Sequence, residues 1–241
     1  IRDSSVTGVQ TCALPICRKA RILESRVKST RFLTDKLREI PNQVRVFLSA
    51  SAIGYYGDQP DHVIVTETSL PGDDFLATVT REWEAAAQEL EKGTAIRLVT
   101  VRIGIVLGRE GALKELARPV KLFAGSPLGR GNQMMSWIHE EDLAGIFIHL
   151  LETDEARGVY NAVSPNPVNN REMVRTIGKV LHRPVFLPPV PGSVLKLILG
   201  EMAIMVLYGS RVSAEKILLA GYRFRFSGLK EALEDIFKSG S

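Results

Sequence analysis

Two mainly apolar segments, residues 44–48 (VRVFL) and 95–101 (AIRLVTV), each pass directly into a stretch of small residues. Such runs are typical of strands buried on both faces, and helical patterns come before and after both of them. Alternation of this kind predicts an α/β fold with a parallel sheet that helices cover on both sides. Ligands of such folds bind at the carboxyl ends of strands, so residues 49–57 and 102–108 mark the expected site.

The rest of the chain is predicted to be mostly helical, with short strands at residues 135–139 and 158–161. Asp73 or Asp74, and further on Asn169 or Asn170, are good helix N-caps. Four prolines within residues 184–191 mark a boundary or a lid, so we expect an α/β domain over residues 18–185 and a small helical lobe over residues 186–241. The expected helices span residues 18–40, 75–91, 113–123, 140–151, 170–181 and 193–208, followed by a helical stretch from Ser213 and a last helix over residues 229–237.

Composition narrows the class of protein. Of 241 residues, 45% are hydrophobic and 24% are charged, which excludes a disordered chain and predicts a globular protein. We expect this protein to be cytoplasmic. The net charge of +4 is spread along the chain without a basic run, so no nucleic-acid partner is indicated. No uncharged apolar stretch is long enough to span a membrane. Lys196 and Glu201 interrupt the apolar segment 193–208, which fits a helix over a cleft or a partner subunit better than a membrane-surface helix.

The first seventeen residues stand apart from this pattern. Residues 6–16 (VTGVQTCALPI) can be back-translated into a string that looks like a standard adapter of short-read DNA sequencing. We therefore interpret residues 1–17 as foreign sequence and expect the native sequence before Arg18 to be missing. A loop-rich N-terminus or a poor signal peptide is the alternative, but a basic region and a continuous apolar region are lacking. Cys12 and Cys17 then carry no redox argument.

The first helix places one cation on its apolar side. At about 100° per residue, Arg26 and Thr30 fall within the arc of the apolar residues. A buried arginine needs an anion or a carboxylate, whereas one at the edge of the arc extends its head into water. The apolar residues that share the arc are Ile22, Leu23, Val27, Leu33 and Leu37.

Several motifs, taken together, resemble the extended short-chain dehydrogenase/reductase superfamily, and more closely its atypical branch of NAD(P)-binding epimerase-like proteins. These motifs are SASAIGYYGD (49–58), VTETSLPGDDFLA (65–77), REWEAAA (81–87), VRIGIVLGREG (101–111), MSWIHEEDLAGI (135–146), GVYNAVSPNPVNNREM (158–173) and GYRFRF (221–226). The last fifty or so residues resemble the C-terminal domain of unknown function of this branch. The resemblance implies a Rossmann-like sheet whose first strands and glycine-rich turn would precede Arg18.

The resemblance also implies a cofactor, NADP or NAD, and oxidoreductase or epimerase chemistry on a small substrate, of which a sugar is one candidate. Ser51 matches the residue that hydrogen-bonds the reacting substrate oxygen, although a strand-end serine can also satisfy loop backbone. Ser49 lies near the expected nicotinamide, and Arg26 matches a helix that approaches the cofactor. Val106 matches a residue whose backbone packs against the nicotinamide, with a core valine as the alternative.

One departure from the superfamily concerns the catalytic pair. In the superfamily a lysine four residues after a tyrosine lowers the pKa of the phenol, which then acts as general acid or base. None of the five tyrosines here has a lysine at that spacing, and the expected segment, residues 75–81, offers only Arg81 as a cation. Tyr55 or Tyr56 could supply the phenol from a neighbouring loop. The missing pair equally fits a dinucleotide-binding regulator without turnover, and the resemblance links some such proteins to cell division.

The other polar candidates are assigned structural roles. We expect Trp83 to pack, Glu84 to lie on a solvated face, His139 to end a strand and Asp142 to cap the following helix. The histidines show no ligand spacing to carboxylates or cysteines, so no metal is implied. The partner that remains is a small-molecule substrate.

Overall fold

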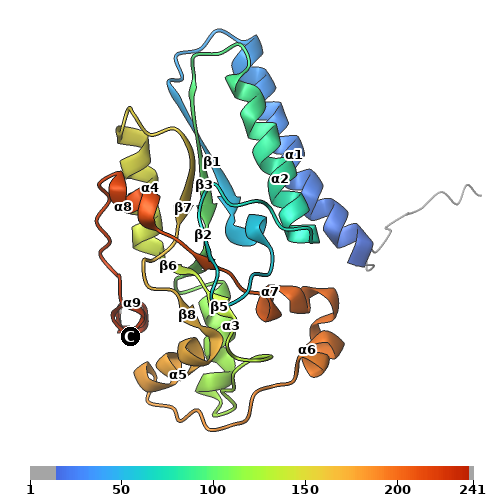
Figure 1. Ribbon diagram of the computed structural model, residues 1–241, viewed down its shortest axis with the longest axis vertical. Helices are drawn as coiled ribbons and strands as arrows, with labels where there is room; N and C mark the ends of the chain where they lie inside the picture. Colours follow the sequence, from blue (N-terminus) through green and yellow to red (C-terminus); the bar gives the residue numbers. More distant parts are fainter. Residues whose placement is uncertain (1–14, 239–241) are drawn as a thin grey trace, which may run out of the picture.

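A computed structural model describes residues 15–238, so most of the segment interpreted as adapter lies outside the described residues. Its centre is a three-stranded parallel sheet in the order β1-β3-β7, formed by β1 (Val46–Ala52), β3 (Arg97–Ile103) and β7 (Gly158–Ala162). Helices α1 (Pro15–Glu39) and α2 (Phe75–Gln88) lie on one side of this sheet, and α4 (Glu140–Glu152) lies on the other (Figure 1). The predicted α/β class with a Rossmann-like parallel sheet is confirmed.

The register of the sheet brings the two predicted strand ends together. Ser51 on β1 lies opposite Arg102 on β3, which in turn lies opposite Asn161 on β7. Because the three strands are parallel, their carboxyl ends meet at one edge of the sheet. The small residues after the two apolar strands therefore border a common region.

Beyond Ile103 the chain leaves the main sheet instead of extending it. Gly104 marks the bend, where a Cβ atom would lie only 2.5 Å from the Ser136 carbonyl oxygen and 2.8 Å from a Val163 methyl carbon. Besides the main sheet, the described residues form three two-stranded sheets. They are β4 (Ile105–Leu107) with β6 (Trp137–His139), β5 (Met134–Met135) with β8 (Val168–Asn169), and β2 (Ile64–Val65) with β9 (Arg211–Val212).

The predicted helix over residues 193–208 is broken in the structure. It consists of α6 (Gly192–Leu199), a 3-10 turn (Gly200–Ala203) and α7 (Ile204–Leu207), and Gly200 adopts a left-handed φ of 57° at the break. None of the described helices has both the length and the apolar character needed to cross a membrane. The remaining helices are α3 (Ala112–Lys121), α5 (Asn170–Val180), α8 (Glu215–Leu219) and α9 (Leu229–Lys238).

Two of the three predicted caps are confirmed. Asp74 and Asn169 accept hydrogen bonds from the first turns of α2 and α5. Asp142 does not cap α4, because His139 takes that position through its ring nitrogen. The Asp142 carboxylate instead accepts hydrogen bonds from the Tyr222 hydroxyl and from the backbone N–H groups of Arg225 and Phe226. It thus fastens the C-terminal segment to α4.

Buried side chains form two adjoining clusters. One surrounds the sheet and includes Val99, Val101, Ile146 and Ile217. The other fills the space between β4, β6 and helices α3, α5 and α9, with Trp137 at its centre. The C-terminal helices therefore complete the core of the α/β part and do not form a separate core of their own.

Candidate functional site

A buried ion pair lies at the carboxyl end of the sheet. The Arg102 Nε and Nη2 atoms donate to the two oxygens of Glu84 on α2, each over 2.8 Å, and both side chains are almost fully buried. Burial works against the charge of Arg102, but the hydrogen bonds and the charge of Glu84 outweigh it and raise the pKa of the guanidinium above its ordinary value. The bidentate geometry fixes the directions of both groups.

Ser51 is attached to this pair. Its hydroxyl donates to the Glu84 Oε1 atom over 2.6 Å. Since a serine hydroxyl has one proton, Ser51 has only lone pairs left for any further partner. Ser49 lies two residues earlier on the same face of β1 and is also buried; its hydroxyl makes a long contact of 3.4 Å with the Ala50 carbonyl oxygen.

The two candidate tyrosines share a 3-10 turn (Ile53–Tyr56) but have different surroundings. Tyr56 is fully buried, and its hydroxyl donates to Asn161 Oδ1 over 2.7 Å and accepts from Arg102 Nη1 over 3.0 Å. Burial raises the pKa of the Tyr56 phenol, and the charge of Arg102 offsets part of that rise. Tyr55 is half-buried, with the Arg102 Cζ atom 3.3 Å from its ring centroid. Within the described residues, the Tyr55 hydroxyl makes no hydrogen bond.

The turn that carries both tyrosines is held by a close crossing of two loops. The Gly72 N–H donates to the Tyr55 carbonyl oxygen over 2.8 Å, and Gly57 has a φ of 65°, which favours glycine. A Cβ atom on Gly72 would lie 2.8 Å from the Gly57 Cα atom. The backbone around the tyrosines is therefore tied to the start of α2.

Gly72→Ala tests this crossing. The added methyl group meets backbone that has no room to move, so we expect the free energy of unfolding to fall by about 1 to 3 kcal/mol. The measurement is urea denaturation followed by circular dichroism. Gly192→Ala is the matched control, because its Cβ atom would approach Leu207 no closer than 3.5 Å. Equal stability of the two variants would contradict the close crossing.

The other predicted site residues lie around this cluster and not within it. Arg26 is exposed on α1, with its Cζ atom 5.4 Å from the Trp83 ring centroid, which fits the alternative of an arginine at the edge of the apolar arc. Val106 is half-buried on β4 and pairs with Ile138 on β6. Arg81 is exposed on α2 and takes no part in the cluster.

Glu84 and Arg102 are the residues that the sequence analysis missed, and Glu84 was wrongly expected on a solvated face. A signal was present for both. Glu84 follows Thr80 by four residues and precedes Ala87 by three, and both are buried on α2. Arg102 ends an otherwise buried strand. One charge of each sign at buried positions of neighbouring elements predicts an ion pair.

A cavity of about 460 Å³ lies close to the turn that carries the two tyrosines, because Asp58, two residues after Tyr56, is one of its lining residues. Asp58 belongs to its wall and accepts a hydrogen bond from the Gly209 N–H over 3.0 Å, which links the tyrosine loop to the C-terminal helical part. Arg130 and Lys196 make the cavity basic. Its remaining lining consists of Gly129, Gly192, Leu207 and Tyr208. Its volume falls in the range of small-molecule sites.

Comparison with known proteins identifies the family. The epimerase family protein SDR39U1 homolog of Arabidopsis thaliana, a chloroplastic protein, is 40% identical over 245 residues, which cover 98% of this chain and 70% of that protein. The epimerase family protein YfhF of Bacillus subtilis is 35% identical over 218 residues, which cover 90% of this chain and 71% of that protein. The chain belongs to this epimerase family. The family assignment made from the motifs is confirmed.

Two further comparisons concern the C-terminal residues and the fold of this epimerase-family chain. A family model for a domain of unknown function, DUF1731, matches residues 190–236. The crystal structure of human epimerase family protein SDR39U1 with NADPH is similar with a TM-score of 0.86 at 35% identity, over 92% of this chain and 75% of that chain. The division of the epimerase-family chain at residues 185 and 186 stays a prediction.

Proposed function

We propose that this protein is an NAD(P)-dependent oxidoreductase or epimerase whose small substrate carries a reacting hydroxyl or carbonyl group. The observation that supports this most directly is the buried Ser51–Glu84–Arg102 cluster. It lies at the carboxyl ends of parallel strands, where such folds bind ligands, and it fixes the direction of a serine hydroxyl. The basic cavity beside the tyrosine loop is of a size for the substrate.

The proposed cofactor is NADP or NAD, as in the NADPH complex of the similar human protein. The residues of this chain fit a nicotinamide in one respect. From Ser49 to Ala52, β1 carries only serine and alanine, so a flat ring can approach the strand closely. We assign Ser49 and the backbone of Val106 to the nicotinamide side and the exposed cation Arg26 to a cofactor phosphate. The bound nicotinamide supplies or accepts the hydride.

Ser51 and Tyr55 then have different roles at the substrate oxygen. In the reductive direction, Tyr55 donates its hydroxyl proton to the carbonyl oxygen as the hydride reaches the carbon, and in the reverse direction the proton returns to Tyr55. Ser51, whose own proton is held by Glu84, accepts a hydrogen bond from the substrate hydroxyl. Tyr56 was predicted as an alternative acid; its hydroxyl is engaged on both sides, so we assign it to holding Arg102 and Asn161.

The test uses the product of the complete gene. Calorimetry measures binding of NADP and NADPH, and a panel of carbonyl compounds and nucleotide sugars is screened for hydride transfer. We expect turnover with a panel member, and Ser51→Ala is expected to lower it at least about tenfold because a hydrogen bond to the reacting oxygen is lost. The Ser51→Ala variant should bind the cofactor as tightly as the unmodified protein does. This binding measurement is the control for folding of the variant.

A second function, a dinucleotide-binding regulator without turnover, is favoured by one observation. No tyrosine is followed at four residues by a lysine, so the usual acid–base pair is absent from the sequence. Tight NADPH binding without consumption across the whole panel would support the regulator and exclude the enzyme. The link of such a regulator to cell division rests on resemblance alone.

A further inference from the structure

The outer side of α5 carries positive charge that stays unpaired within the described residues. Arg171, Arg175 and Lys179 follow one another at four-residue intervals, so they share one side of the helix. All three are exposed, and none makes a side-chain hydrogen bond or ion pair in the part of the chain that the structure describes. Exposed lysines on other helices do pair, as Lys114 does with Glu110. We call Arg171, Arg175 and Lys179 the basic face.

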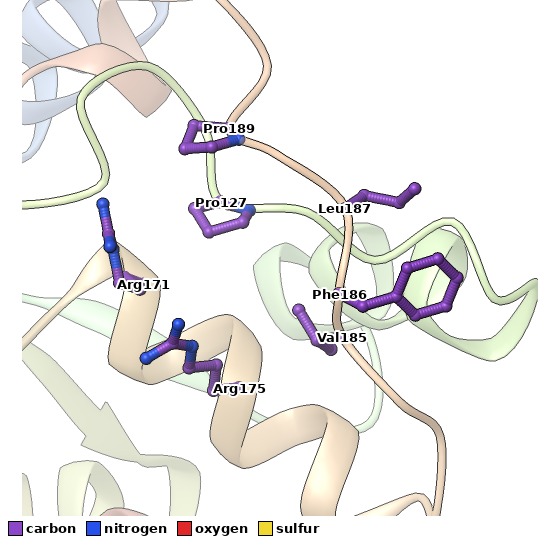
Figure 2. Close-up of a pocket in the computed structure, with 7 residues that line it drawn as sticks. All are labelled: Pro127, Arg171, Arg175, Val185, Phe186, Leu187 and Pro189. Atoms are coloured by element: carbon purple, nitrogen blue, oxygen red, sulfur yellow. The ribbon is translucent and has the colours of Figure 1, made fainter.

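A small pocket separates the two arginines of the basic face from the proline-rich segment 184–190. Its volume is about 110 Å³. Figure 2 shows Arg171 and Arg175 rising from α5 on one side, while the segment with Phe186 and Leu187 passes on the other. Phe186 is 71% exposed, and its ring points away from the two arginines, on the far side of the segment (Figure 2).

The proline-rich segment is bonded to α5 near its start and to residues 126–127 near its end. The Arg183 N–H donates to the Gly178 carbonyl oxygen over 2.8 Å, and the Val190 N–H donates to the Pro127 carbonyl oxygen over 2.9 Å. The Ser126 hydroxyl also donates to the Pro188 carbonyl oxygen. These bonds fix both ends of the proline-rich segment. The pocket is therefore formed by the protein itself, before any ligand binds. A preformed surface spares a binding partner the cost of ordering it.

The size of the pocket limits how much of a ligand can enter it, and the two arginines favour an acidic group. At about 30 Å³ per water molecule, its volume corresponds to three or four waters, which is enough for one small polar group. Enclosed sites for small molecules are several times larger, roughly 300 to 1,000 Å³. A ligand that inserts one acidic group must therefore lay the rest of its length over the exposed apolar side chains. Arginine and aromatic residues are both enriched at protein interfaces.

We propose that the basic face and the pocket form a docking site for an acidic peptide segment of a partner protein, which also carries an apolar residue that reaches across the proline-rich segment. The carboxylates pair with Arg171 and Arg175, and the apolar residue packs on Phe186 and Leu187. The site lies at the end of the molecule opposite α1, well away from β1 (Figure 1). The proposal therefore stands whether or not the protein turns over a substrate.

A labelled peptide tests the docking site on the 241-residue chain. The probe is fluorescein-labelled Gly-Glu-Leu-Asp-Phe-Glu-Gly, and its neutral counterpart is Gly-Gln-Leu-Asn-Phe-Gln-Gly; binding is followed by fluorescence anisotropy. We expect the acidic peptide to bind at least about tenfold more tightly than the neutral one, because two charge-assisted contacts are at stake. The double variant Arg171→Gln/Arg175→Gln is expected to remove this preference.

The matched control is Arg157→Gln/Arg223→Gln, which changes the net charge equally at two exposed arginines elsewhere. It should bind the acidic peptide within about twofold of the unmodified chain, since distant surface charges contribute little. Equal binding of both peptides, or equal loss in both double variants, would overturn the proposal. Sedimentation velocity covers the other occupant: self-association that Arg171→Gln/Arg175→Gln abolishes would assign the face to a second copy and also overturn it.

Discussion

Glu84→Ala is expected to lower the free energy of unfolding by about 3 to 5 kcal/mol, because it leaves a buried guanidinium without its counter-charge. In the native protein Arg102 donates to both Glu84 oxygens, and Ser51 donates to one of them. The variant removes the acceptor of all three hydrogen bonds. Urea denaturation followed by circular dichroism and by tryptophan fluorescence measures the change.

Two further variants separate the ion pair from general damage to α2. Glu82→Ala removes an exposed carboxylate from the same helix and is expected to change stability by less than about 0.5 kcal/mol. Glu84→Met/Arg102→Met removes both charges and retains volume, so it should be more stable than Glu84→Ala alone. If Glu84→Ala were as stable as Glu82→Ala, the buried pair would not have the energetic role assigned to it here.

The strands of the sheet could be predicted from the sequence because each is marked by a pattern within one short segment. Two apolar runs followed by small residues fix both the strands and the edge where ligands bind, and the register of Ser51 with Arg102 confirms that these ends adjoin. The caps at Asp74 and Asn169 could be predicted equally well, because a short polar side chain just before an apolar helical pattern is typical of a helix N-cap.

The orientation of α1 could not be predicted from its apolar residues. The helix buries Val27, Thr30 and Thr34, while Leu33 is 49% exposed. The reason is tertiary: the Trp83 indole N–H donates to the Thr30 hydroxyl over 3.0 Å, so a threonine is needed where a wheel would place a leucine. Turning the helix this way brings Arg26 to the surface beside Trp83.

The site itself was only half predictable, because its charges come from elements that are distant in sequence. Ser51 could be assigned from its place after a strand, but its partner Glu84 lies 33 residues away on a helix. The two tyrosines are adjacent, and no local pattern states which of them is buried. The packing of Tyr56 against Asn161, 105 residues further on, decides that.

Tyr55→Phe is expected to lower kcat/KM for hydride transfer by about 10² to 10⁴-fold, the range for loss of a positioned acid or base. The change leaves stability nearly untouched, because the Tyr55 hydroxyl makes no hydrogen bond within the described residues and the ring can still rest on Arg102. The measurement uses the product of the complete gene with the substrate found in the panel and monitors oxidation of NADPH.

Tyr56→Phe is the matched variant, and the reverse result is expected. It leaves Asn161 Oδ1 without the Tyr56 donor and leaves Arg102 Nη1 with only its 3.3 Å bond to the Glu67 carbonyl oxygen, so the free energy of unfolding should fall by about 1 to 3 kcal/mol. Turnover of the folded fraction should fall far less than in Tyr55→Phe, because a phenol that already donates to an amide and accepts from a guanidinium has no hydrogen bond to give to substrate. Loss of turnover in Tyr56→Phe with full activity in Tyr55→Phe would exchange the two roles. It would make the buried hydroxyl the acid and require the turn to open during catalysis.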